Sequence, residues 1–184
     1  MTGTIRGVMA GAAVAVLAAC GATQQGTGSS SPRAFSVPIY SANGQQVGSF
    51  MVTQVSADSV RLVVESTSMP AGTHGTHLHA VGRCDAPQFT TAGPHLNPTN
   101  RQHGLRNPQG PHLGDMPNLT VGANGQGRLE TIVRGSLTPG RAPIFDADGT
   151  ALVVHATADD QVTDPAGNSG ARIACGVVAA PTSS

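Results

Sequence analysis

The sequence of 184 residues contains no tryptophan and no lysine, and aromatic residues make up only 3% of it. With so few aromatic rings, a hydrophobic core has to be built from Val, Ile, Leu and Ala side chains. Glycine (24 residues) and proline (13 residues) are abundant, so these apolar side chains fall in short segments separated by turns. This composition favours an all-β fold, and the length suits one globular domain.

Positive charge is scarce and scattered along the chain. All ten basic residues are arginines, and ten acidic residues balance them. A protein that binds nucleic acid needs a concentrated patch of positive charge to hold the phosphate backbone. We therefore expect no nucleic-acid partner, and attraction of an anionic ligand has to be local.

An uninterrupted apolar run lies near the N-terminus. Arg6 precedes small and apolar residues at 7–19, a length typical of a signal peptide and too short to span a bilayer comfortably. The run ends in LAAC (17–20), which resembles a bacterial lipobox with Cys20 as the lipidated residue. We therefore expect residues 1–20 to be a lipoprotein signal peptide, and the protein to be exported and lipid-anchored at the cell envelope, on the periplasmic or cell-surface side. The alternative is an ordinary cleavage site with an incidental cysteine.

Cysteine is rare, with three residues in the whole chain. If Cys20 carries a lipid, Cys84 and Cys175 remain as an even pair that could form one disulfide in an oxidising compartment. The alternative is a free reactive thiol outside the cytoplasm.

The rest of the chain divides into a short tether and a β-rich domain. Residues 21–33 are small and polar, which predicts a flexible tether, and we expect the folded domain over 34–180. Asn124-Gly125 is a strong hairpin signal, and about eight strands are typical of an antiparallel sandwich or barrel. The predicted strands are 34–40, 47–55, 60–67, 76–82, 119–122, 128–133, 151–157 and 172–178.

Two long segments lack strand signals. Residues 83–118 and 158–171 are rich in Gly, Pro, Asn, His and Asp, and the first is far longer than the roughly 12–15 residues of an ordinary structureless loop. Something other than a hydrophobic core must order the first segment.

Six of the seven histidines lie between positions 74 and 112, which indicates a metal site. His77 and His79 are two positions apart in a predicted strand, so their side chains project from the same face and can bind one ion. Alone, such a pair is a weak signal. His95, His103, His112 and Asp115 add three imidazoles and a carboxylate, a set suited to a structural Zn²⁺ that orders the loop.

These segments together resemble the copper,zinc superoxide dismutase family. The resemblance is strong over residues 74–178 and only architectural over 34–73. The matching motifs are GTHLH (75–79), GPHLNP (93–98), HLGD (112–115), VVH (153–155) and GNSGARIACG (167–176).

The resemblance implies a fold, two cofactors and an activity. The fold is an eight-stranded antiparallel Greek-key barrel or sandwich with long metal-binding and electrostatic loops. The activity is conversion of superoxide to O₂ and H₂O₂, which would protect the cell envelope. Each subunit would hold one copper ion and one zinc ion, with His95 bridging them. The implied copper ligands are His77, His79, His95 and His155, and the implied zinc ligands are His95, His103, His112 and Asp115.

The resemblance also implies roles around the metals. Arg172 would hold the superoxide anion, a task that suits a permanent cation with several donors, and His95 would supply a proton. Asp159 would accept hydrogen bonds from one copper ligand and one zinc ligand. Cys84 and Cys175 would form a disulfide.

Other interpretations remain open at this point. A non-catalytic copper or zinc carrier explains the ligands but has no need of Arg172, and a metal-stiffened interaction module would need an exposed apolar patch. The protein is expected to be a monomer or a homodimer. The segment 158–171 contains no basic residue, so long-range steering of the substrate would depend on arginines elsewhere, such as Arg101, Arg106 or Arg141. His74 matches a structural position of the family.

Overall fold

The computed structural model describes residues 1–4, 34–137, 144 and 146–178. The predicted lipidation site at Cys20, the tether and Arg141 lie outside the described residues. Within the described part of the chain, no helix has the length and apolar character needed to cross a membrane.

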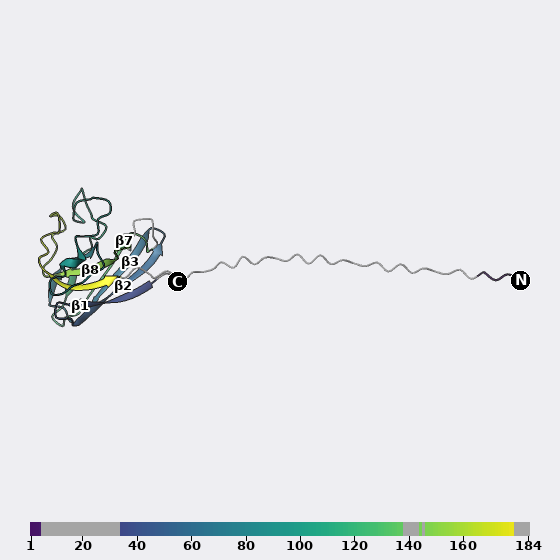
Figure 1. The fold of residues 1–184 in the computed structure, drawn as a ribbon, viewed down its shortest axis with the longest axis horizontal. Coiled ribbons are helices and arrows are strands. Elements are labelled where there is room, and N and C mark those ends of the chain that lie inside the picture. Colours follow the sequence, from purple (N-terminus) through teal and green to yellow (C-terminus); the bar gives the residue numbers. More distant parts are fainter. Residues whose placement is uncertain (5–33, 138–143, 145, 179–184) are drawn as a thin grey trace. The chain divides into compact units, whose positions relative to one another are not determined.

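The described chain is built almost entirely from strands (Figure 1). A single turn of 3₁₀ helix, η1 (Thr90–Ala92), interrupts the first long loop. The strands are β1 (Ala34–Ser41), β2 (Gln46–Ser56), β3 (Ser59–Ser66), β4 (Gly72–His74), β5 (Thr76–His79), β6 (Leu119–Val121), β7 (Gly127–Arg134), β8 (Thr150–His155) and β9 (Arg172–Val178).

The nine strands form one antiparallel sheet with the order β4-β6-β7-β3-β2-β1-β9-β8-β5. Its two edge strands, β4 and β5, are neighbours in the chain with only Gly75 between them, so the sheet curls into a nearly closed barrel. The connections from β5 to β6 and from β7 to β8 join strands that are not neighbours in this order. The predicted all-β antiparallel barrel is confirmed.

The strand pattern differs from the prediction around β4 and β5. The predicted strand 76–82 ends at His79, because the next backbone groups pair with the loop: the Ala80 N–H donates to the Pro94 carbonyl (2.9 Å) and that of Val81 to Ala92 (3.0 Å). The ninth strand, β4, lies between the predicted strands 60–67 and 76–82, where no strand was predicted. Three residues are too few for an alternating pattern to be recognised.

The barrel is filled mainly by branched aliphatic side chains, together with the buried Phe50 and two methionines. Phe50, Leu62, Leu78, Leu119 and Leu152 are fully buried in one hydrophobic cluster, and each such side chain contributes roughly 1.5–3 kcal/mol on burial. This core needs no metal to form, and it provides a stiff frame for the site.

The two long loops cover the outer face of β5 and β8, so every residue of these two strands is buried. Figure 1 shows both loops on the same side of the sheet, and hydrogen bonds join them, including one of 3.0 Å from the Arg106 N–H to the Gln161 carbonyl. A disulfide between Cys84 and Cys175, as the resemblance implied, connects the first loop to β9. The loops therefore form a lid over one wall of the barrel.

Candidate metal centre

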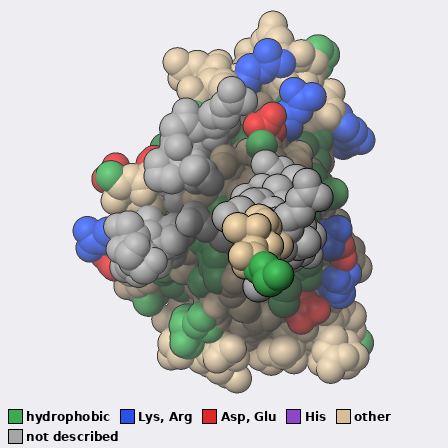
Figure 2. Space-filling model, turned by 90° about the vertical axis from the view of Figure 1, so that its right-hand side faces the viewer, with side chains coloured by type: hydrophobic (Ala, Val, Ile, Leu, Met, Phe, Trp, Pro, Cys, Tyr) green, Lys and Arg blue, Asp and Glu red, His purple; other side chains and the backbone are tan. Residues whose placement is uncertain are grey.

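All seven histidines are buried, and none is visible on the face of the molecule drawn in Figure 2. Surface histidines are common in proteins without metals, whereas a buried set needs partners for its ring nitrogens. The contacts of these rings therefore define the site.

Two strands position three of these histidines. β5 directs His77 and His79 to the face covered by the loops, while Leu78 between them enters the barrel core. β8 pairs antiparallel with β5 and ends at His155. His95, from the first long loop, forms a backbone bridge with His79. His77 and His79 share one face of β5, as predicted, and they lie there in one group with His95 and His155.

One ring nitrogen of each of these four histidines has no hydrogen-bond partner in the described part of the chain. The four atoms are His77 Nδ1, His79 Nε2, His95 Nε2 and His155 Nε2. The ligand atoms of these residues lie within 4.8 Å of one another. An unpaired buried polar atom costs about 1–3 kcal/mol, so four of them around one point indicate a site for an ion that accepts nitrogen ligands.

The opposite ring nitrogens are held by acceptors. His79 Nδ1 donates to the Gly93 carbonyl (2.8 Å) and His155 Nδ1 to the Gly170 carbonyl (3.1 Å), and His77 Nε2 donates to Asp159 Oδ2 (2.7 Å). A carbonyl or carboxylate oxygen only accepts, so the proton of each neutral ring lies on the outer nitrogen. The lone pair of each inner nitrogen is thereby turned toward the common centre.

Burial keeps these rings neutral. It lowers the pKa of His77 to about 3, that of His79 to about 2 and that of His155 to about 4. Repulsion from His95 contributes to all three of these lowered pKa values. Neutral imidazole is the form that binds a metal ion, so these three rings do not have to lose a proton first at neutral pH.

A second cluster surrounds the carboxylate of Asp115. Its Oδ1 atom lies 2.9 Å from His103 Nδ1, 3.1 Å from His95 Nδ1 and 3.3 Å from His112 Nδ1. Its Oδ2 atom accepts the backbone N–H groups of Gly104 (2.8 Å) and His112 (2.9 Å). The three imidazoles and one carboxylate predicted from the sequence therefore converge on one point, and His95 belongs to both clusters.

His77 also lies within 4.8 Å of His95, His103 and Asp115. We assign it to the first cluster alone, because its Nε2 atom is used by Asp159 and its free Nδ1 atom is one of the four unpaired nitrogens. His112 then completes the second cluster.

The second cluster is rich in negative charge. Burial opposes the charge on His103, but hydrogen bonds to Asp115 and Asp159 outweigh it and raise the pKa of His103 to about 9. Burial likewise opposes the charge on Asp115, yet its hydrogen bonds hold the pKa of that carboxyl well below its usual range. Asp164 adds a carboxylate that accepts the His103 backbone N–H (2.6 Å) and lies 3.8 Å from His112 Nε2. Such a site suits a divalent cation.

Asp159 joins the two clusters. Its two oxygens accept from His77 Nε2 (2.7 Å) and His103 Nε2 (3.0 Å). Asn118 holds the backbone of Asp159 from both sides, donating to its carbonyl and accepting its N–H, each at 2.9 Å. One carboxylate therefore fixes one ring of each cluster, as the resemblance implied.

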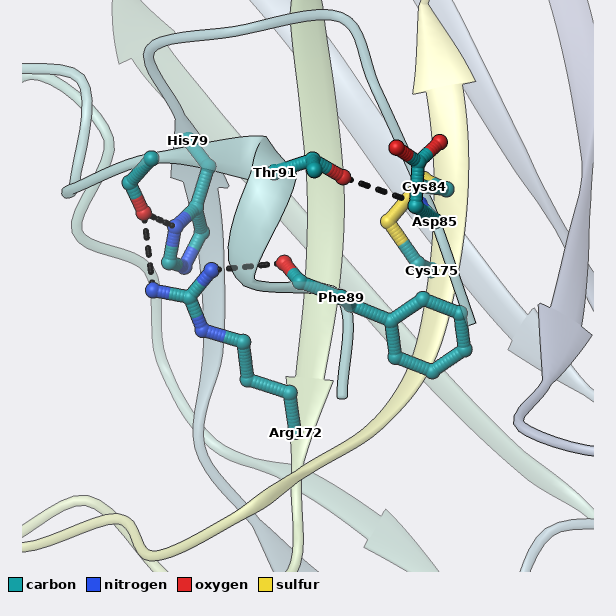
Figure 3. Close-up of a disulfide and its surroundings, with 8 residues drawn as sticks. His79, Cys84, Asp85, Phe89, Thr91, Arg172 and Cys175 are labelled. Atoms are coloured by element: carbon teal, nitrogen blue, oxygen red, sulfur yellow. Dashed lines mark hydrogen bonds between the residues drawn. A yellow bond between two sulfur atoms is a disulfide. The ribbon is translucent and has the colours of Figure 1, made fainter. Parts of the chain in front are cut away.

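Arg172 lies at the start of β9, beside His79 (Figure 3). Its Nη1 atom donates to the Phe89 carbonyl and its Nη2 atom to the Gly93 carbonyl, both at 2.7 Å. The Gly93 carbonyl also accepts from His79 Nδ1. Arg172 is partly buried, and two of the five N–H donors of its guanidinium are used by these two carbonyls.

Sequence reasoning did not identify Phe89, Gly93 or Asn118 as parts of this site. Phe89 and Gly93 act through backbone carbonyls, which carry no residue-specific signature. Asn118 is one polar residue among many in the first loop. A usable signal did exist at Phe89, because a large apolar side chain is out of place in a polar loop unless it is buried.

His74 makes contacts that differ from those of the other six histidines. Its Nδ1 and Nε2 atoms lie 2.8 Å and 2.9 Å from the carbonyl oxygens of His155 and Pro70. Both nitrogens are thus engaged by backbone, and His74 braces the end of β8.

The barrel and its paired clusters define a β-barrel protein built to bind two metal ions at adjacent sites. The family model for copper/zinc superoxide dismutase (SODC) matches residues 46–178. The chain is 39% identical to "Superoxide dismutase [Cu-Zn] 1" of Aquifex aeolicus over 147 residues, covering 76% of this chain and 84% of that protein. It is 38% identical to "Superoxide dismutase-like protein YojM" of Bacillus subtilis over 147 residues, covering 77% and 74%.

Solved structures show the same similarity. The crystal structure of a SOD-like protein from Bacillus subtilis matches with a TM-score of 0.71 and 36% identity, over 78% of this chain and 97% of that one. The Cu/Zn superoxide dismutase from Brucella abortus matches with a TM-score of 0.59 and 27% identity, over 79% and 99%.

The chain belongs to the copper/zinc superoxide dismutase family, a family of oxidoreductases. Its cofactors are copper and zinc, and both clusters of ligand-type side chains fit metal binding.

Proposed function

We propose that the protein catalyses the dismutation of superoxide. Copper would be bound by His77, His79, His95 and His155, and zinc by His95, His103, His112 and Asp115. The observation that carries this proposal is the set of four buried ring nitrogens without a hydrogen-bond partner in the described part of the chain. In three of these rings the opposite nitrogen donates to an oxygen acceptor. In the fourth ring, that of His95, the opposite nitrogen lies in the second cluster. Imidazole nitrogens suit copper in both of its oxidation states.

The reaction consumes two superoxide anions and two protons and yields one O₂ and one H₂O₂. Copper, when bound, supplies the one-electron oxidant for the first superoxide and the one-electron reductant for the second. The residues of this chain handle charge and protons around that chemistry. Arg172 would hold the anion through the N–H donors that the Phe89 and Gly93 carbonyls leave free, and His95 would deliver one of the protons from its Nε2 atom.

Zinc would have a structural role. Its four ligands all come from the first long loop, which has little hydrophobic core of its own. Binding a closed set of three imidazoles and one carboxylate stabilises such a loop directly. Because Asp159 accepts hydrogen bonds from both His103 and His77, it would hold the copper ligand His77 in place relative to this loop.

We further propose that the protein is exported, anchored through a lipid on Cys20, and protects the cell envelope from superoxide. The apolar run and LAAC motif before residue 21 support this location, and the Cys84–Cys175 disulfide suits an oxidising compartment. Radiolabelled fatty acid or mass spectrometry of the N-terminal peptide tests the anchor, and loss of the label in Cys20→Ser is the expected result.

The activity is tested with the full chain loaded with copper and zinc, next to His155→Ala with its metal content measured. We expect fast turnover of superoxide by the first protein. Loss of copper and of turnover together in the variant would support the enzyme and its site. Tight copper binding without turnover by the unaltered protein would favour a metal carrier on a dismutase scaffold.

A further inference from the structure

Phe89 occupies an unusual position between the disulfide and Arg172. Its side chain is 2% exposed although it lies in a polar loop, and its backbone φ is 53°. A bulky residue rarely adopts this left-handed conformation, which costs on the order of 1 kcal/mol or more. The surrounding contacts must therefore hold Phe89 in place.

These contacts form a closed turn with an apolar anchor. The Phe89 N–H donates to the Asp85 carbonyl (3.0 Å), and the Asp85 N–H donates to Thr91 Oγ1 (2.9 Å). The ring belongs to a small apolar cluster, and Figure 3 shows it beside Cys175. The other members of this cluster are Ala92, Ala151, Val153, Cys175 and the partly buried Cys84.

The carbonyl of Phe89 points away from the anchored ring and toward the guanidinium. It accepts from Arg172 Nη1 at 2.7 Å, while Gly93 accepts from Nη2 at the same distance. Two acceptors on different nitrogens fix the plane of a guanidinium, whereas one acceptor leaves it free to rotate. The Phe89 carbonyl is therefore one of the two acceptors that together fix the orientation of Arg172.

We propose that Phe89 is a positioning residue for Arg172: its buried ring, packed against the disulfide, fixes the carbonyl that orients the guanidinium toward an anion. The disulfide then acts on Arg172 through the Phe89 ring as well as through the chain. This inference rests on the proposed role of Arg172 as the anion contact.

Two variants change the anchor without removing the carbonyl. Phe89→Ala removes the ring, and Phe89→Leu keeps an apolar side chain of intermediate size. The matched control is Phe50→Leu, because Phe50 is fully buried in the barrel and belongs to a different cluster. Thermal unfolding, metal content and a free-thiol assay confirm that each variant is folded, loaded and oxidised.

The first readout needs no metal. Phenylglyoxal modifies accessible arginines, and mass spectrometry of the peptide that contains Arg172 gives its rate of modification in the metal-free protein. We expect Phe89→Ala to increase this rate severalfold and Phe89→Leu to increase it less, because a hydrogen bond to the guanidinium is weakened. Phe50→Leu should leave the rate unchanged.

The second readout is azide binding to the copper- and zinc-loaded protein, followed by absorption spectroscopy. We expect affinity to fall about tenfold in Phe89→Ala, the size of effect for one hydrogen bond to a charged group. In an Arg172→Ala background the same substitution should have no further effect. This non-additivity separates positioning of Arg172 from a general loss of stability.

The proposal is overturned if Phe89→Ala leaves both readouts unchanged, or if Phe50→Leu changes them equally. It is also overturned if the effect on azide persists without Arg172. Failure of the proposed function is a separate outcome: a wild-type protein that does not dismute superoxide would still show whether Phe89 controls the modification of Arg172.

Discussion

The two clusters of ligand-type side chains are anchored in different ways. Three of the four histidines in the first cluster project from β5 and β8, strands that the barrel core holds in place. All four residues of the second cluster come from the loop between β5 and β6. Hydrophobic burial can thus organise a site in advance, whereas a loop that contributes only a few side chains to the core depends more on polar contacts and on the ion itself.

Removal of zinc should produce the largest difference between the two regions. The loop residues 95–118 lose the ion that ties them together, so we expect their amide hydrogen exchange to accelerate by orders of magnitude. The amides of β5 and β8 should keep most of their protection. Hydrogen exchange with mass spectrometry on metal-loaded and zinc-free protein measures both, and equal loss of protection in the strands would contradict the comparison.

Leu78→Ala tests the other side of the comparison. Leu78 is fully buried in the barrel between the two histidines of β5, so its truncation should lower the free energy of unfolding by about 2–5 kcal/mol. Chemical denaturation measures this loss. Leu105→Ala, at a side chain that is 43% exposed on the first loop, is the control and should change stability by less than about 0.5 kcal/mol.

The substitution Asp159→Asn should affect both clusters of ligand-type side chains, because Asp159 contacts one ring of each. His77 and His103 use different oxygens of Asp159, and asparagine replaces one of these oxygens with an NH₂ donor, so one of the two rings loses its acceptor. We expect metal affinity to fall about 10- to 100-fold, measured by competition with a chromophoric chelator. Asp160→Asn makes the same chemical change at the next residue, which contacts neither histidine, and should leave affinity unchanged. A loss confined to one metal would show that the carboxylate serves only one cluster.

The smallest expected effect concerns salt. The loop 158–171 carries three aspartates and no basic residue, and Arg101 and Arg106 donate to the carbonyls of Gly110 and Asp160. Long-range attraction of superoxide should therefore be weak, and kcat/KM should change less than about twofold between roughly 0.01 M and 0.15 M ionic strength.

A gain-of-charge variant provides the matching control for this prediction. Asp160→Arg adds a cation to the loop and should make turnover faster at low salt and more sensitive to salt. Strong salt dependence in the unaltered protein would mean that arginines elsewhere provide the steering.

Most predictions for the strands of the barrel came from local sequence patterns. Short β-rich runs between turn residues identified the strands, and the alternation of side chains along a strand placed His77 and His79 on one face. The three-residue strand β4 was missed, and the strand at 76–82 was drawn too long, because pairing of Ala80 and Val81 with the loop is a long-range contact. The division of the ligands between copper and zinc, and the disulfide, came from resemblance to a family.

Residue type and spacing in the sequence indicated an all-β fold, metal-binding chemistry and six of the seven candidate ligands, and the resemblance to a family added His155. Only the tertiary structure decided which nitrogen of each ring faces the centre and how Asp159 spans both clusters. It alone showed that the carbonyls of Phe89 and Gly93 hold Arg172. The physical reason is that hydrogen-bond geometry depends on groups far apart in the chain, and backbone acceptors are the same in every residue.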